Sequence, residues 1–74
     1  MNNLPQFVKK RRKKLNLTQV EFAEKAGVGL TVVRKIEQGK ENLSMAKVNQ
    51  VLIMFGHILQ PVNIKDYEEG ISKV

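Results

Sequence analysis

Residues 18–40, TQVEFAEKAGVGLTVVRKIEQGK, contain the pattern that most constrains the fold of this chain. Ala23 is small enough to let two helices approach closely, and Gly27 follows the first helical stretch, where a turn requires positive φ. Val33 and Ile36 are three residues apart and therefore share one face of the second stretch. The pattern predicts two short helices that cross after a tight turn, which is the helix-turn-helix motif. In this motif the second helix enters the major groove of DNA.

Length and composition limit the chain to one small domain. Its 74 residues are near the lower end of what folds alone, and the absence of cysteine excludes disulfides and thiolate metal sites. Helix packing must supply the stability, often together with a partner chain. No apolar run approaches the roughly 20 residues that span a bilayer, and the charged N-terminus is not followed by the apolar stretch of a signal peptide. We therefore expect a cytoplasmic protein that does not associate with membranes.

The charge balance favours a polyanionic partner. Thirteen Lys and Arg residues against seven Asp and Glu residues give a net charge of +6, which suits nucleic acid first and an anionic membrane surface second. Charge alone also fits a basic domain with no such ligand, but the helix-turn-helix pattern favours DNA. Six of the positive charges form the run KKRRKK at residues 9–14. Because a helix spreads this run around its circumference, it is either a solvated face or a set of phosphate contacts.

Local signals predict the first two helices. The first is expected over Leu4–Leu15, with Asn3 as its N-cap and Pro5 in its first turn, where the missing N–H costs nothing. The second is expected to begin after Thr18, because Thr18 and Glu21 have the spacing of a capping box. In that motif the hydroxyl and the carboxylate each accept a hydrogen bond from the other residue's backbone N–H.

Two more helices follow. The third is expected over Leu30–Gln38, with Gly29 before it and Gly39 as its C-terminal stop. Ser44 is a suitable cap for the fourth, which should end before Gly56. Its inward stripe is predicted to contain Met45, Val48, Val51, Leu52 and Phe55.

The periodicity changes after residue 56. Residues 57–64 favour a β-strand, because Pro61 excludes a helix and restricts the strand to the edge of a sheet. A single strand cannot satisfy its own backbone, and the simplest partner is the same strand of a second copy. The remaining residues, 65–74, are polar and are expected to form a tail. The side chains predicted to share one face of this dimerising strand are Ile58, Gln60, Val62 and Ile64.

The stretch 18–40 resembles the XRE, or Cro/phage-repressor, helix-turn-helix family. The motif's characteristic positions carry Gln19, Ala23, Gly27, Val33 and Ile36, and IEQGK resembles the family's signature at the end of the recognition helix. The resemblance covers about residues 4–56. It implies a mainly α fold, namely a lambda-repressor-like DNA-binding domain of four to five helices.

The same resemblance implies which side chains contact DNA. The recognition helix would present Leu30, Thr31, Arg34 and Lys35 to base edges. Arg and Lys suit the O6 and N7 atoms of guanine, whereas Leu or a Thr methyl suits the thymine methyl. Leu30 departs from the polar residue common in this family and could instead cover the turn. Contacts to the phosphate backbone are expected from Gln19, from Lys40 and from the N–H of Gly39, although Lys40 could simply be solvated.

A structural ion pair between Arg12 and Glu37 is also implied by the resemblance. It would tie the first helix to the third and remove Arg12 from any role at the DNA. The alternative is that Arg12 is one more member of the basic run. Truncation of one partner of a buried pair typically costs about 3–5 kcal/mol.

The C-terminal part is similar to HipB-like antitoxins. The expected organisation is therefore a DNA-binding domain over residues 1–56, a dimerising strand over 57–64 and a tail over 65–74. The expected function is that of a homodimeric repressor which binds an inverted-repeat operator and represses its own operon, with a HipA-type kinase toxin as a possible partner. A stand-alone or phage-type regulator, or an antitoxin that chiefly binds the kinase, stays open. No enzymatic activity, cofactor or metal is expected, because His57 is the single histidine and has no nucleophile partner.

Overall fold

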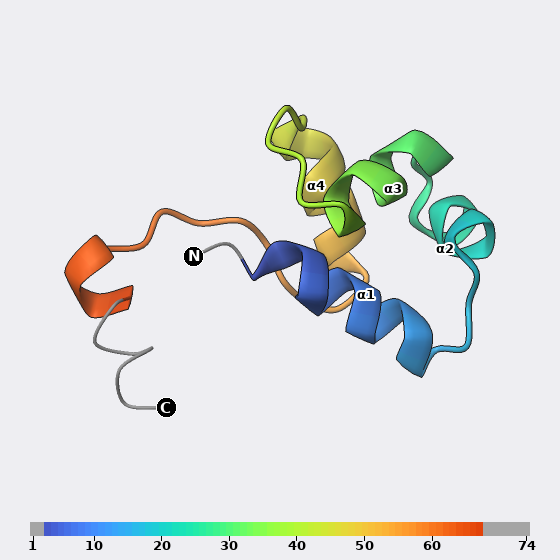
Figure 1. Cartoon of the computed structure of the whole chain (residues 1–74), viewed down its shortest axis with the longest axis horizontal. Coiled ribbons are helices and arrows are strands. Elements are labelled where there is room, and N and C mark those ends of the chain that lie inside the picture. The colour runs from blue at the N-terminus through green and yellow to red at the C-terminus, as the bar shows by residue number, and fades with distance from the viewer. Residues whose placement is uncertain (1–2, 68–74) are drawn as a thin grey trace.

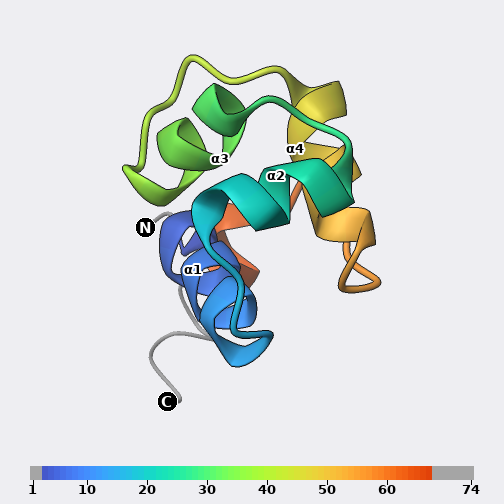
Figure 2. The same cartoon turned by 90° about the vertical axis from the view of Figure 1, so that its right-hand side faces the viewer.

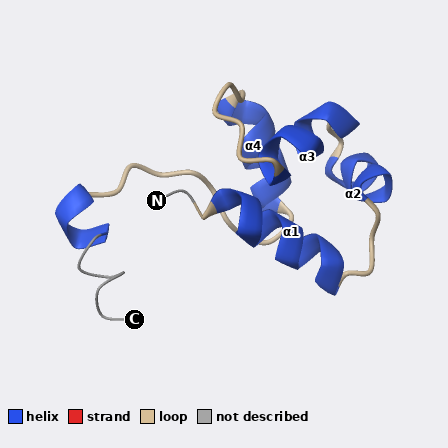
Figure 3. Ribbon diagram, viewed as in Figure 1, coloured by secondary structure: helices blue, strands red, loops and turns tan. Residues whose placement is uncertain are grey.

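The computed structural model describes residues 3–67, and this part of the chain is mainly helical (Figure 1). The four helices are α1 (Leu4–Lys14), α2 (Gln19–Ala26), α3 (Leu30–Glu37) and α4 (Met45–Ile53). Their order and approximate bounds agree with the four predicted helices. Figure 3 shows no strand in residues 3–67.

Helix α3 is the central element, since it packs against each of the other three helices (Figure 2). All four helices contribute to one apolar core, which explains how so short a chain buries enough surface to fold. Phe22 and Ile36 are among the largest side chains that are completely buried. The buried core consists of Val8, Phe22, Ala23, Ala26, Val33, Ile36, Val48, Val51 and Leu52.

Aromatic rings close one side of this core. Phe55 follows α4 and lies parallel to Phe22, with ring centroids 5.7 Å apart. Phe7 of α1 meets Phe55 edge-to-face at 6.1 Å. Both arrangements are favourable for aromatic pairs. The residues after α4 are thereby fastened to α1 and α2.

All four helices end in the same way. A residue with positive φ follows each helix within three positions: Asn16, Gly27, Gly39 and Gly56. After α3, Gly39 N–H donates to the carbonyl of Ile36 at 3.1 Å and Lys40 N–H donates to that of Lys35 at 3.0 Å. These two bonds define a Schellman motif, and the expectation that Gly39 stops α3 is confirmed.

Two of the three side chains predicted to cap helix N-termini do so. Thr18 and Glu21 form the predicted capping box, with hydrogen bonds of 3.1 Å and 2.9 Å, and Ser44 accepts a hydrogen bond from Lys47 N–H. The side chain of Asn3, in contrast, makes no cap hydrogen bond. Its backbone has φ −95° and ψ 3° instead of the extended conformation that aims a capping side chain at the helix.

The inward face of α4 differs from the predicted stripe at its first residue. Met45 is 67% exposed, because the core packs against the later part of the helix, at Val48, Val51 and Leu52. The helix also ends at Ile53, earlier than the sequence suggested. Phe55 nevertheless faces inward, because it stacks on Phe22 from the turn that follows the helix.

The C-terminal segment does not form the predicted strand within the single chain. Residues 57–63 have no regular secondary structure, and residues 64–67 form one helical turn. That turn is favoured by Asn63, whose Oδ1 accepts hydrogen bonds from Lys65 N–H at 2.9 Å and Asp66 N–H at 3.3 Å. A strand here needs a second strand for its backbone groups, so its pairing stays a prediction for an assembly. Four residues proposed to form its face are exposed: Ile58, Gln60, Val62 and Ile64.

Candidate nucleic-acid interface

The outward face of α3 carries the side chains that the sequence assigned to base contacts. Successive residues turn by about 100° around a helix, so the buried Val33 and Ile36 fix the inward direction. Thr31 then lies opposite the core, with Arg34 and Lys35 on either side of it. Thr31 and Arg34 are exposed, whereas Lys35 is half-buried.

These three side chains have no role in holding the described fold together. Thr31, Arg34 and Lys35 form no side-chain hydrogen bond or ion pair with any other residue of the described chain. Their donors are therefore available to a ligand. Leu30 differs, since it is half-buried at the start of α3, which fits both its expected contact with a base and its alternative role over the turn.

The turn between α2 and α3 is held by a side chain that the sequence did not reveal. Gln50 of α4 donates from Nε2 to the carbonyls of Ala26, at 3.1 Å, and Gly27, at 2.9 Å. Gly27 itself has φ 73°, and a Cβ at this position would lie 3.0 Å from Gln50 Nε2. Both observations explain why glycine is needed there. No local pattern could have identified Gln50, because it lies more than twenty residues from the carbonyls it contacts.

Arg12 and Glu37 form the ion pair between α1 and α3. Arg12 Nε lies 2.7 Å from Glu37 Oε2, and Nη2 donates to Oε1 at 3.0 Å. The two side chains are only 11% and 5% exposed. Arg12 Nη1 also donates to the carbonyl of Leu17 at 2.8 Å. One guanidinium thus joins α1, the loop before α2 and the last turn of α3, in the bidentate geometry that makes such pairs strong.

The environment of Glu37 favours its charged form. Burial raises the pKa of this carboxyl, but hydrogen bonds from Arg12 and Gln19 and the charges of Arg12 and Lys9 together outweigh that effect. The net result is a pKa below the ordinary value. For Arg12, the hydrogen bond with Glu37 raises the pKa further, although burial opposes it. Both groups are therefore charged at neutral pH.

Gln19 belongs to this network as well. Its Nε2 donates to Glu37 Oε1 at 3.2 Å, so one of its two amide hydrogens is engaged inside the protein. The second hydrogen of that nitrogen is not required by this bond and could still reach a phosphate. The network therefore fixes the orientation of Gln19 at the start of α2.

The expected phosphate contact from the backbone N–H of Gly39 is wrong. That N–H donates to the carbonyl of Ile36 within the Schellman motif, so it is not available to DNA. The side chain of Lys40 is exposed just beyond α3. Lys40 is therefore the group at this end of α3 that a phosphate could reach.

The basic run does not form one surface. Arg12 is committed to Glu37, and the guanidinium of Arg11 lies over the rings of Phe7, at 5.2 Å, and Phe55, at 5.9 Å, in positions suited to cation–π attraction.

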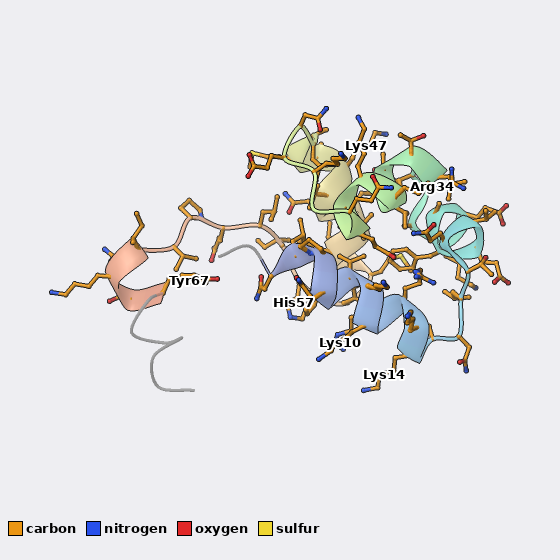
Figure 4. All side chains as sticks on the ribbon, in the orientation of Figure 1. Lys10, Lys14, Arg34, Lys47, His57 and Tyr67 are labelled. Carbon is orange, nitrogen blue, oxygen red and sulfur yellow. The ribbon has the colours of Figure 1, made fainter. Side chains whose placement is uncertain are left out.

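Two further members of the run lie far from α3. In Figure 4, Lys10 and Lys14 point away from the lower edge of the molecule, whereas Arg34 and Lys47 lie at its upper edge. Lys10 and Lys14 thus cannot share one DNA contact surface with Arg34. Lys47, in the first turn of α4, was not among the residues predicted for DNA contact, but it is exposed and lies near Arg34 in this view.

Other kinds of site find no support in the described residues. Within residues 3–67, no group of three or more His, Asp or Glu side chains is arranged to hold a metal ion. In the same range, no helix combines the length and apolar character required to cross a membrane.

The arrangement of α2, the turn and an exposed, cationic α3 is that of helix-turn-helix DNA-binding proteins. The family model described as Helix-turn-helix (HTH_3) matches residues 8–56, about two thirds of the chain. The chain therefore belongs to this family of XRE-type helix-turn-helix regulators, which bind DNA. No curated protein shows significant similarity to it.

Proposed function

We propose that this protein is a sequence-specific transcriptional repressor that binds an inverted-repeat operator as a homodimer. The observation that carries this proposal is the outward face of α3, whose Thr31, Arg34 and Lys35 are unengaged within the described chain and sit on a helix held from three sides. A rigid helix with free cationic donors is what direct reading of base edges requires.

Base contacts and phosphate contacts divide between the helix and its flanks. Arg34 and Lys35 donate to guanine, while Thr31 and Leu30 contact thymine methyl groups. Gln19 at the start of α2 and Lys40 after α3 bind phosphates on either side. Lys47 joins this second group, because it is exposed and lies at the same edge of the molecule as Arg34 in Figure 4. Phosphate contacts fix the position of α3 in the groove but do not themselves read sequence.

Dimerisation follows from the same geometry. Two recognition helices must lie about 34–36 Å apart to read successive turns of one face of DNA, and residues 57–64 are the segment available to join two copies. In this proposal they pair as strands across a two-fold axis, burying Ile58, Val62 and Ile64, which are 59–67% exposed in the single chain. The DNA-binding domain then comprises residues 1–56; of the tail expected over 65–74, residues 68–74 lie outside the part of the chain that the structure describes.

The biological setting that best fits is a HipB-like antitoxin that represses its own operon in the cytoplasm and binds a HipA-type kinase. It rests on the resemblance of α4 and the segment after it to such proteins. In this role the chain is neither an enzyme nor a cofactor-binding protein. A stand-alone or phage-type regulator shares every DNA contact described above and differs only in lacking the toxin.

A mobility-shift assay with the DNA upstream of the protein's own gene tests the proposal. We expect a retarded complex whose footprint covers two half-sites related by inverted symmetry. Absence of any retardation at low salt contradicts DNA binding itself. Co-purification with a kinase encoded beside this gene supports the antitoxin role, whereas an isolated gene supports the stand-alone regulator.

A further inference from the structure

An apolar groove lies beside α4, away from the outward face of α3. Its volume is about 650 Å³, which is within the 300–1,000 Å³ typical of binding clefts. Val48 and Leu52 form its almost fully buried floor, and Met45, 67% exposed, stands at its edge. Residues 57–60 form part of its wall, and Lys40 and Glu41 add charges to its rim.

The chain's own C-terminal segment leaves this groove. Leu59 is held at the wall, because its N–H donates to Asn49 Oδ1 at 2.7 Å. Pro61 follows, and the chain then runs away from the four helices, as Figure 1 shows. Beyond that point Val62 and Ile64 are 63% and 67% exposed. The molecule therefore carries an uncovered apolar groove and, directly beyond it, an uncovered apolar arm, defined as residues 61–64.

We propose that the groove of each copy receives the arm of a second copy of this chain, with Val62 and Ile64 packed against the exposed Met45 and the half-buried Leu43. This proposal rests on the homodimer proposed above: it keeps the pairing of residues 57–64 across the two-fold axis and adds that one face of the arm packs on α4 of the other copy. The exchange is reciprocal, so a two-fold axis places both arms in both grooves and closes the assembly at two copies.

Charge supports this occupant over an unrelated one. The groove's rim carries an exposed anion, Glu41. The arm is followed by an exposed cation, Lys65. An arm that enters with Lys65 toward Glu41 forms a favourable pair. Such a pair contributes little affinity but selects orientation.

Strand pairing alone does not cover the apolar side chains of the arm. Antiparallel pairing satisfies backbone N–H and C=O groups along an edge, while side chains project from the two faces of the ribbon. The apolar side chains of the arm still need a surface to pack on. The two arrangements therefore predict different neighbours for Val62: its own twin in simple pairing, and α4 of the other copy in the exchange.

Disulfide trapping distinguishes these neighbours, and the chain offers a clean background because it has no cysteine. The variants Met45→Cys and Val62→Cys are mixed in equal amounts and oxidised gently. We expect a mixed disulfide dimer, because exchange brings the two positions within bonding distance. Its formation should exceed that of a matched mixture of Lys10→Cys and Val62→Cys on the order of tenfold, as proximity raises the effective concentration.

Each other outcome has a defined meaning. If the mixed dimer forms no faster than in the Lys10→Cys mixture while the native mass is that of a dimer, the exchange is wrong and the homodimer stands. Predominant Val62–Val62 disulfide likewise replaces it with simple strand pairing. In a single chain that carries both Met45→Cys and Val62→Cys, a monomeric internal disulfide means that the arm folds onto its own groove, which contradicts the exchange. A monomeric native mass overturns the homodimer itself.

A second measurement avoids covalent trapping. Met45→Asp and Ile53→Asp alter two positions on α4 of nearly equal exposure, 67% and 62%, but only Met45 lines the groove. Sedimentation should show the dimer dissociation constant of Met45→Asp raised on the order of tenfold, the usual effect of placing a charge against an apolar partner. Ile53→Asp should leave it unchanged. Equal effects of the two substitutions contradict the exchange.

Discussion

Arg12 reaches Glu37 across 25 positions of sequence, with Nε 2.7 Å from Oε2 and Nη2 3.0 Å from Oε1. The contact is a direct side-chain link between α1 and α3, in addition to their shared core. It also lies next to Gln19, at the start of α2. One ion pair and its hydrogen-bond partner thus connect three of the four helices, α1, α2 and α3.

Replacement of Arg12 by alanine should destabilise the fold. The carboxylate of Glu37 would remain nearly buried without its main partner, and breaking such a pair costs about 3–5 kcal/mol. In a chain of this size each kcal/mol lowers the melting temperature by about 4–8 °C. Thermal unfolding followed by circular dichroism measures the loss. Lys10→Ala, in the same basic run but without a partner among residues 3–67, is the control, and an equal melting temperature for both variants would contradict the role of the pair.

Stability should fall in acid because of Glu37. Its pKa is below the ordinary value in the folded chain, so the unfolded chain takes up the proton first. The stabilisation is complete above the ordinary pKa of about 4.3 and is lost as the pH falls through the lower folded value. Melting temperatures measured from about pH 6 to pH 3 should show this decline, and Glu37→Gln should flatten it.

The contribution of Glu21 to the loss of stability in acid must be distinguished from that of Glu37. Two hydrogen bonds with Thr18 lower the pKa of Glu21 as well. The larger effect comes from the backbone N–H of Thr18, and the smaller from the Thr18 side chain. The variant Glu21→Gln therefore serves as the comparison. If it flattens the acid decline as much as Glu37→Gln does, the decline belongs to helix capping in general and not to the ion pair.

Truncation of Lys35 and truncation of Lys40 should weaken DNA binding in different ways. Lys35→Ala removes a base contact and should cost about 1–3 kcal/mol at one operator position while relaxing the preference there. Lys40→Ala removes a phosphate contact, so binding should weaken equally on all sequences and the salt slope should fall by about one unit. Titrations of operator and scrambled duplexes at several salt concentrations measure both. Interchanged phenotypes would reverse the assignments.

Lys10 and Lys14 should not contribute to binding at the same DNA site. They lie on the opposite edge of the molecule from Arg34 (Figure 4), beyond the reach of a duplex held by α3. The double variant Lys10→Gln and Lys14→Gln should therefore keep the salt slope of the wild type, because each lost phosphate contact would lower it by about 0.9. A slope lower by nearly two units would show that α1 touches the operator.

The glycines at the two ends of the turn should respond oppositely to substitution. Gly27→Ala places a Cβ at φ 73° and 3.0 Å from Gln50 Nε2, so we expect a loss of about 1–2 kcal/mol. Gly29 has open space around it and precedes α3 without a side-chain cap. Gly29→Ser should supply that cap and gain a few tenths of a kcal/mol. Denaturant unfolding compares the two, and equal destabilisation would refute the argument.

The helical part of the fold was predictable because its signals are local. The capping box at Thr18, the positive-φ glycines and the spacing of Val33 and Ile36 each act within a few residues. Gln50 and Asn49 were missed, because a side chain that bonds a distant backbone group leaves no periodic trace. Met45 was misassigned for a related reason: helical spacing gives a face, but it does not tell how far the core extends along that face.

The candidate site likewise contains some contacts that the sequence predicted and others that it did not. The Arg12–Glu37 contact was expected from the family resemblance and is present, whereas neither periodicity nor composition pointed to it. The availability of the Gly39 N–H was misjudged, because the helix stop that the glycine creates consumes that donor. The strand predicted over residues 57–64 requires a second chain, so its formation stays a prediction that one chain's local sequence cannot establish.

The side chains on the outer surface of α3 do not stabilise the fold. The residues that hold this helix in place, by burial or by an ion pair, lie on its other side: Val33, Ile36 and Glu37. Exchanging Thr31, Arg34 or Lys35 should therefore redirect the protein to a different operator at little expense in stability. Under the proposed function, the architecture separates the residues that keep the molecule folded from those that distinguish one DNA sequence from another. A lineage of such chains could acquire new targets one residue at a time without passing through unfolded intermediates.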